Sequence, residues 1–171
     1  RKGSLKGYTA PESGAWRGMM SNGGRLILEW ESNDDGQLPS SVFYKRIVMA
    51  DLAHSRNKLN TATHKLIRDV KSYQVETSFL TSRACQEGLI KEAGLKINKV
   101  FGSDLRPVAS SLGPKEQLES KFAILLDDFN AEDGWEQQWL LDKSAAKASI
   151  AEFAKMHAYF WEGSNFWKQD G

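Results

Sequence analysis

The chain has 171 residues, of which 40% are hydrophobic and 26% are charged, and its formal net charge is +1 at pH 7. This composition is typical of a globular protein with one domain and a sizeable core. The near-neutral charge gives no support for nucleic acid or an acidic membrane as a partner. No apolar run approaches the roughly 20 residues that span a bilayer, and no signal-peptide pattern is visible at the start.

Cys85 is the only cysteine in the sequence. A single cysteine excludes an internal disulfide and suits a reducing compartment, so we expect a cytoplasmic protein. The neighbouring residues include no histidine that could activate the thiol. A structural role is therefore favoured over a nucleophilic one.

Residues 1–15 contain Gly, Ser, Thr and Pro with little apolar patterning, and they predict a flexible entry segment. Two apolar runs follow, Trp16–Met20 and Arg25–Trp30, with Asn22-Gly23 between them. Asn-Gly between apolar runs is the strongest short-range signal for a β-hairpin. A plain turn would explain this dipeptide without any further role.

The run Val42–Met49 is rich in branched and aromatic residues and predicts a buried strand, the third of an antiparallel meander over residues 16–50. A helix is predicted over His64–Leu80, with weaker helical character continuing to Gly94. Its apolar stripe consists of Leu66, Val70, Tyr73 and Leu80.

Two more strands are predicted at Leu95–Phe101 and Phe122–Leu126, the second being a central strand because it is uninterrupted and apolar. The segment Gly102–Ser120 between them is expected to be a mobile loop. Gly134-Trp135 suggests a turn with a packed tryptophan.

A last long helix is predicted to begin after Asp142, which can cap it. One face of this helix carries Ala146, Ile150, Phe153, Ala154, His157 and Trp161. No second ligand lies at metal-binding spacing from His157, so we expect a buried core histidine rather than a metal or catalytic residue.

Lys45 in the third strand and Glu76 on the flank of the first helix are the candidate functional pair. Kinases hold nucleotide phosphates with a strand lysine that a helix glutamate keeps in place. A lysine removed from water needs a carboxylate partner to stay charged. The plainer alternative is an edge-strand lysine and an unrelated glutamate on an amphipathic helix.

Two segments look like kinase motifs but do not have their context. Ile67–Gln74 contains Arg-Asp as in the kinase catalytic loop, but it lies in a continuous helical pattern only 24 residues after Lys45. Asp128-Phe129-Asn130 approximates Asp-Phe-Gly, but no catalytic loop precedes it. We assign neither motif.

Several segments, in order and spacing, resemble the ecdysteroid-kinase-like and choline-kinase-like phosphotransferases, which are related to the aminoglycoside phosphotransferases. The similarity covers most of residues 16–167 and is carried by Ser41–Arg46, Lys65–Leu80, Phe122–Phe129 and Ala151–Trp161. Gly18–Asn22 is similar to the phosphate loop of the choline kinases, although Met19 stands where a second glycine is usual. Phe43 stands where a small residue usually precedes the lysine by two positions.

The resemblance implies an α+β protein-kinase-like fold: a small lobe with a five-stranded antiparallel sheet and one packed helix, a hinge, and the first helix of a large lobe. The corresponding ranges are a flexible entry segment at 1–15, the small lobe at 16–126, the hinge and linker at 127–141, and the truncated large lobe at 142–171.

The resemblance also implies site roles. Lys45 would contact the α- and β-phosphates of ATP, and Glu76 would hold Lys45. Ser21 and Asn22 would lie over the phosphates. Asp127, Asp128 and Phe129, in the hinge, would offer backbone groups to the adenine edge.

A His-x-Asp catalytic loop occurs nowhere in the sequence. We therefore expect the base and the Mg²⁺ ligands to lie in a part of the protein outside this chain, which would supply the nucleotide-binding portion of a kinase acting on a small hydroxyl-bearing substrate. The alternative is a truncated, non-catalytic pseudokinase-like lobe that acts as an interaction module. It would self-associate through its exposed aromatic C-terminal segment, which includes Trp161, Phe166 and Trp167. The third alternative is simply an incomplete sequence.

Overall fold

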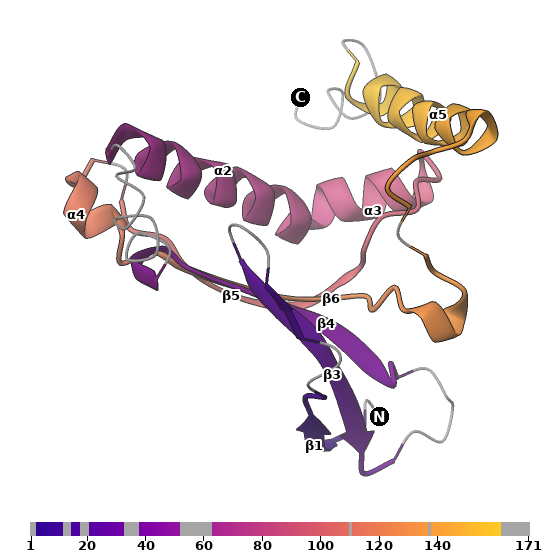
Figure 1. The fold of residues 1–171 in the computed structure, drawn as a ribbon, viewed down its shortest axis with the longest axis horizontal. Helices are drawn as coiled ribbons and strands as arrows, with labels where there is room; N and C mark the ends of the chain where they lie inside the picture. The colour runs from indigo at the N-terminus through magenta and orange to yellow at the C-terminus, as the bar shows by residue number, and fades with distance from the viewer. Residues whose placement is uncertain are drawn as a thin grey trace. The chain divides into compact units, whose positions relative to one another are not determined.

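The computed structural model describes residues 3–11, 15–17, 21–32, 38–51, 63–109, 111–136 and 138–161. The fold is α+β and divides into two compact units (Figure 1). The first unit consists of Arg1–Ser78 and Val100–Asp128, and the second of Phe79–Lys99 and Phe129–Gly171.

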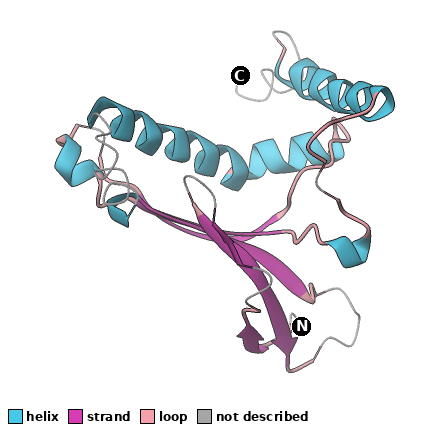
Figure 2. Cartoon of the chain, in the orientation of Figure 1, coloured by secondary structure: helices cyan, strands magenta, loops and turns pink. Residues whose placement is uncertain are grey.

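An antiparallel sheet forms the frame of the first unit (Figure 2). In the described residues it has six strands, in the order β1-β3-β4-β6-β5, with β2 pairing β3 off this path. The strands are β1 (Leu5–Thr9), β2 (Ala15–Arg17), β3 (Asn22–Trp30), β4 (Ser41–Val48), β5 (Val100–Arg106) and β6 (Lys121–Leu126). The predicted antiparallel sheet is confirmed: the five predicted strands correspond to β2–β6, and β1 is an additional strand.

The core of the first unit lies between this sheet and helix α2 (Thr63–Thr81). Ile47 on β4 pairs directly with Phe122 on β6, so both side chains point to the same face. Val70 and Tyr73 of α2 pack against that face, and all four side chains are buried. The predicted strand and helix, and the predicted apolar stripe at Val70 and Tyr73, are confirmed.

The β2–β3 hairpin is present, but the prediction that Asn22-Gly23 forms its turn is wrong. Arg17 pairs with Asn22, so the connection falls before Asn22, and residues 18–20 lie outside the described residues. Asn22 and Gly23 instead begin β3, where Gly23 pairs with Lys45 of β4. Pairing with two neighbouring strands outweighs the local turn preference of Asn-Gly.

Two further segments differ from the expectation. The entry segment 1–15 contains β1, which pairs with β3 although it has few apolar residues, because backbone hydrogen bonds to an existing strand do not require an apolar pattern. The fourth predicted strand, Leu95–Phe101, begins only at Val100 and runs to Arg106, into the predicted loop. A short helix, α4 (Pro114–Gln117), lies in the same loop.

The second unit packs helix α3 (Arg83–Lys91) against helix α5 (Lys143–Phe160). Ser82 caps α3 by accepting a hydrogen bond from the backbone N–H of Cys85, which separates α3 from α2. The core consists of Leu89, Leu95 and Tyr159. Gly88 allows this approach, because a Cβ there would lie 1.7 Å from Tyr159 Oη.

Asp142 caps α5 as predicted, since its carboxylate accepts a hydrogen bond from the backbone N–H of Ala145 at 2.7 Å. The expectation that His157 is a buried core histidine is wrong. Tyr159 is the buried residue, whereas His157 is exposed along with Phe153. The helix carries two apolar stripes, and α3 packs on the one that includes Met156 and Tyr159.

Among the described residues, no helix combines the length and apolar character needed to cross a lipid bilayer.

Candidate functional site

Lys45 lies on the helix-covered face of β4, the central strand of the sheet. The register places Lys45 between Gly23 of β3 and Ile124 of β6. Because side chains alternate along a strand, Lys45 shares this face with Ile47. The lysine side chain keeps only 20% of its exposure, so its ammonium group needs a partner in place of water.

Glu76 of α2 supplies that partner. Its carboxylate oxygen Oε1 forms an ion pair with Lys45 Nζ and accepts a hydrogen bond from it. Glu76 comes three residues after Tyr73, which brings it to the side of α2 that meets the sheet. The glutamate side chain is 36% exposed, so solvent screens the ion pair. Loss of the pair should therefore lower the free energy of unfolding by only about 1 kcal/mol. The pair therefore fixes the position of the ammonium group more than it stabilises the fold.

Gly23, which pairs with Lys45, has no side chain, and the ring of Phe43 occupies the space beside it. A Cβ at Gly23 would come within 2.7 Å of Phe43 Cζ and 3.0 Å of the Tyr44 carbonyl oxygen. The ring of Phe43, two residues before Lys45 and on the same face, thus packs on the glycine. In the family that the chain resembles, a small residue stands two positions before the strand lysine, whereas this chain has the aromatic ring of Phe43 there.

Asp128 follows β6 and uses its side chain to hold the sheet together. Its oxygen Oδ2 accepts a hydrogen bond from Ser41 Oγ at 2.7 Å and lies 2.7 Å from Arg25 Nε. The Asp128 side chain is buried, so this network joins the end of β6 to β3 and β4. Asp127 is half-buried in the same unit.

Arg25 is a site residue that sequence reasoning missed. Its alternation with Leu26 and Leu28 would by itself indicate a solvent-facing charge, but the pairing of Arg25 with Phe43 places it on the same face of the sheet as Lys45. The sequence does not indicate which carboxylate pairs with Arg25, because Asp128 lies 103 residues further along the chain.

Ser21 and Asn22 are not both brought to the face of Lys45. Ser21 is buried just before β3. Asn22 pairs with Arg46, one position from the Gly23–Lys45 pair, so strand alternation directs its side chain to the opposite face of the sheet.

Phe129 belongs to the second unit, unlike the other predicted site residues. Its ring stacks on Trp135, with 4.2 Å between ring centroids and an interplanar angle of 18°. The 3-10 helix η2 (Ala131–Asp133) and Gly134, at φ 81°, form the turn that brings the two rings together. The predicted turn is confirmed, and Trp135 packs against Phe129 while 46% of it stays exposed.

The structure gives no metal site in the part of the chain that it describes. No three His, Cys, Asp or Glu side chains there gather closely enough to hold an ion. Comparisons of the chain with family models, with curated proteins and with solved structures find no match. The candidate site is therefore defined by its own chemistry: a partly buried ammonium group, held by a carboxylate, that can bind an anionic group.

Proposed function

We propose that the chain is the nucleotide-binding portion of an ATP-dependent small-molecule kinase, which transfers the γ-phosphoryl group to a substrate hydroxyl. The observation that supports this proposal is the Lys45–Glu76 ion pair between the central strand and the helix on its face. Kinases position nucleotide phosphates with a strand lysine held in this way by a helix glutamate. The α+β architecture, with one helix on an antiparallel sheet, is compatible with such a lobe.

In this proposal Lys45 binds the phosphates of ATP, and Glu76 keeps the ammonium group in place. The residues fit the phosphates through the partly buried ammonium group of Lys45, which Glu76 holds in place. They fit adenine less well, since the ring of Phe43 covers Gly23 on that face. A base bound there must stack on this ring or displace it.

ATP with Mg²⁺ would supply the transferable phosphoryl group and neutralise its charge. We assign the Mg²⁺ ligands and the catalytic base to a part of the protein outside this chain. Lys45 and Glu76 bind and orient the nucleotide, and no transfer step is assigned to either residue.

Calorimetric titration of the 171-residue chain with ATP tests this proposal. We expect Lys45→Met to weaken binding about tenfold or more, because the phosphates lose a charged partner. Lys71→Met is the matched control, since Lys71 is exposed on the same helix as Glu76. Failure of the unmodified chain to bind ATP, or an equal effect of the two variants, would contradict the proposal.

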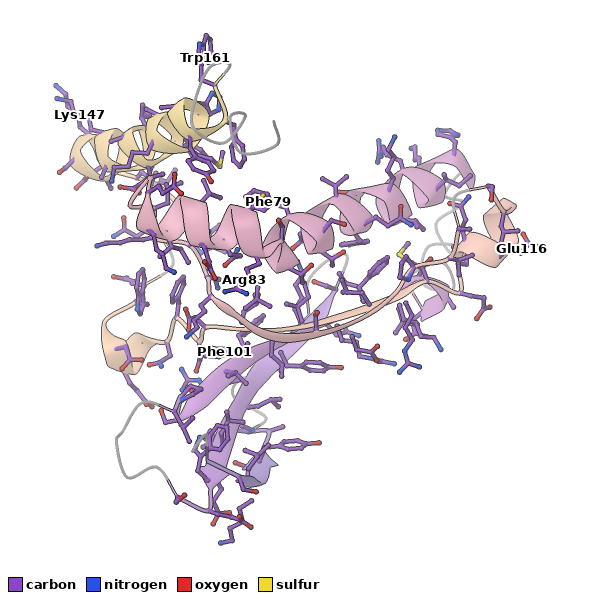
Figure 3. All side chains as sticks on the ribbon, turned by 180° about the vertical axis from the view of Figure 1, so that it is seen from behind. Phe79, Arg83, Phe101, Glu116, Lys147 and Trp161 are labelled. Atoms are coloured by element: carbon purple, nitrogen blue, oxygen red, sulfur yellow. The ribbon has the colours of Figure 1, made fainter. Side chains whose placement is uncertain are left out.

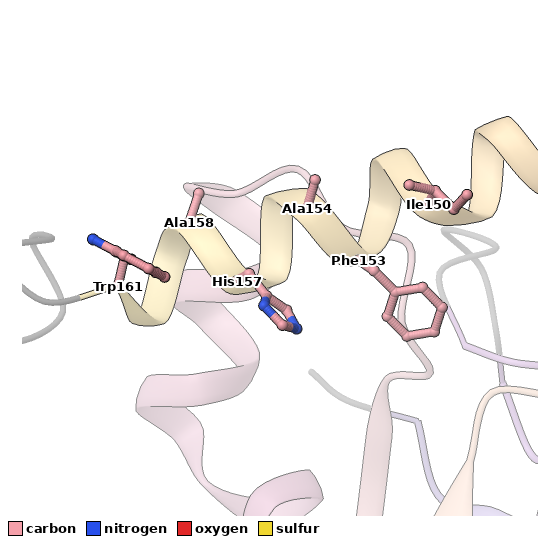
Figure 4. Close-up of a pocket in the computed structure, with 6 residues that line it drawn as sticks. All are labelled: Ile150, Phe153, Ala154, His157, Ala158 and Trp161. Carbon is pink, nitrogen blue, oxygen red and sulfur yellow. The ribbon is translucent and has the colours of Figure 1, made fainter.

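A second candidate function is a non-catalytic module that self-associates through α5. Ile150, Phe153 and Trp161 keep 67%, 61% and 71% of their exposure. With Ala154, His157 and Ala158 they line an open, mostly apolar groove of about 630 Å³ (Figure 4). Figure 3 shows Trp161 extending outward at the end of this helix. Apolar residues aligned in this way along one helix suit pairing with a second copy.

Two residues of the predicted aromatic segment, Phe166 and Trp167, lie outside the described residues. The second candidate therefore depends on the groove of α5 alone.

Sedimentation of the chain over a range of concentrations tests the second candidate. We expect a dimer that Phe153→Glu converts to monomer, because a charge would be buried in an apolar contact. Ala151→Glu places the same charge on the same helix outside the groove and should leave the dimer intact. A monomer at all concentrations would refute this function without affecting the ATP proposal.

A further inference from the structure

The face of the sheet opposite Lys45 carries a group of cations from three adjacent strands. Arg46 of β4, Ala123 of β6 and Asp104 of β5 lie in one row across the sheet. The next row on the same face consists of Val48, Lys121 and Arg106. Neighbouring strands are about 4.8 Å apart, so the charged groups of both rows lie around the small side chain of Ala123.

These residues line a groove of about 190 Å³, to which Tyr44 also contributes. The volume is smaller than the roughly 300–1,000 Å³ of pockets for drug-sized ligands. A groove of this size therefore suits one small chemical group better than an extended peptide or a whole nucleotide.

The groove has a surplus of positive charge. Arg46, Arg106 and Lys121 oppose the single carboxylate of Asp104. Arg106 binds that carboxylate through two hydrogen bonds, Nε to Oδ1 at 3.0 Å and Nη2 to Oδ2 at 2.8 Å. This contact lowers the pKa of Asp104, so the carboxylate stays ionised at neutral pH and the formal charge of the groove is +2.

Two features of this exposed group favour an anion as its ligand. Lys121 and Arg106 are paired directly across adjacent strands, where like charges destabilise a sheet. In the part of the chain that the structure describes, neither Arg46 nor Lys121 forms an ion pair with a carboxylate. A bound anion would give Arg46 and Lys121 a partner of opposite charge. It would also reduce the repulsion between Lys121 and Arg106.

We propose that this groove binds a phosphate group, as a free phosphate or as a phosphate monoester. A dianion matches the charge of +2, and guanidinium and ammonium groups are the side chains that bind phosphate in proteins. The inference does not rest on the proposed kinase function, because the groove and Lys45 lie on opposite faces of the sheet.

An NMR titration of the ¹⁵N-labelled chain with inorganic phosphate, at ionic strength held constant with chloride, tests the site. We expect saturable shifts at the backbone amides around Ala123, and about tenfold weaker binding in Lys121→Gln. Lys71→Gln, on the exposed side of α2, is the matched control and should bind as the unmodified chain does. Shifts that do not saturate, or an equal loss of affinity in both variants, would overturn the proposal. Arg46→Gln replaces Lys121→Gln if that variant does not fold.

Two further ligands distinguish the source of the phosphate. Tighter binding of a phosphoserine peptide than of inorganic phosphate would support a phosphorylated protein as the partner, and equal binding would support a free phosphate. Acetate that binds as tightly as phosphate would overturn the phosphate assignment, because the groove would then select no dianion.

Discussion

The two units of this chain bury their apolar residues to very different extents. The core of the first unit, with Ile47, Val70 and Phe122, is almost inaccessible to solvent. The second unit buries Leu89, Leu95 and Tyr159, yet Trp139 and Leu140 remain 90% and 89% exposed. In the first unit a sheet covered by one helix closes a core, whereas the packing of α3 on α5 in the second unit leaves apolar surface without cover. We therefore expect the first unit to resist local opening more strongly.

The largest expected effect comes from opening the better-packed core. Ile47→Ala should lower the free energy of unfolding of the first unit by about 3 kcal/mol, because it leaves a cavity between β4 and α2. Denaturant unfolding measures the loss, and amide exchange should locate it in β4, β6 and α2. The control is Ile27→Ala, which truncates a half-exposed isoleucine and should cost less than about 1 kcal/mol. Equal costs would show that the first unit has no specific core at Ile47.

Gly88→Ala disrupts the close contact between Gly88 of α3 and Tyr159 of α5 in the core of the second unit. The new Cβ would overlap the Tyr159 hydroxyl, and we expect a cost of about 2 kcal/mol and faster amide exchange in α3 and α5. Gly7→Ala is the control, since its Cβ would meet no atom within 4 Å. If Gly88→Ala is as mild as Gly7→Ala, the close packing of α3 on α5 is incorrect.

Asp128→Asn tests whether the buried ion pair contributes to the order of the first unit. The amide keeps the shape of the side chain but loses the charge opposite Arg25, so we expect a cost of about 1–2 kcal/mol. Asp51→Asn, at an exposed position, should be neutral within about 0.5 kcal/mol. Thermal unfolding of both variants measures the difference, and an unchanged midpoint in Asp128→Asn would argue against the network.

The smallest effect is a pH dependence confined to the second unit. Burial raises the pKa of the Tyr159 phenol above its ordinary value of 10.0, and the charges of Glu92 and Cys85 add to the shift. The unfolded chain therefore releases this proton first. The resulting stability is fully present below pH 10 and is lost as the pH rises through the raised pKa. Urea midpoints at alkaline pH should fall less steeply in Tyr159→Phe, and parallel curves for the two proteins would contradict the assignment.

The local pattern of apolar residues was sufficient to predict most strands and helices of the first unit. The branched and aromatic run at Val42–Met49 and the stripe at Val70 and Tyr73 predicted β4 and α2 correctly. Pairing partners were harder to predict. The strand β1 has no apolar pattern, and the local preference of Asn22-Gly23 for a turn lost to pairing with Arg46 and Lys45.

The candidate site likewise combines features that follow from local patterns with features that depend on contacts between distant segments. The likeness to kinases paired Lys45 with Glu76, although the two residues alone also fitted an edge-strand lysine and an unrelated glutamate, and the structure joins them in an ion pair. Strand alternation directs Asn22 to the opposite face, which became visible only once its position in β3 was known. The Arg25–Asp128 contact needed the order of the strands, because its two partners come from distant parts of the sequence.

The sequence by itself determined most of the strands and helices, since side-chain periodicity is a local property, but it did not indicate β1, α4 or the bounds of β5. The tertiary structure alone decided which stripe of α5 is buried, because two stripes were apolar and only packing against α3 chose between them. It likewise decided that Arg46, Lys121 and Arg106 meet around Ala123, since sheet register is a long-range property that no single strand encodes.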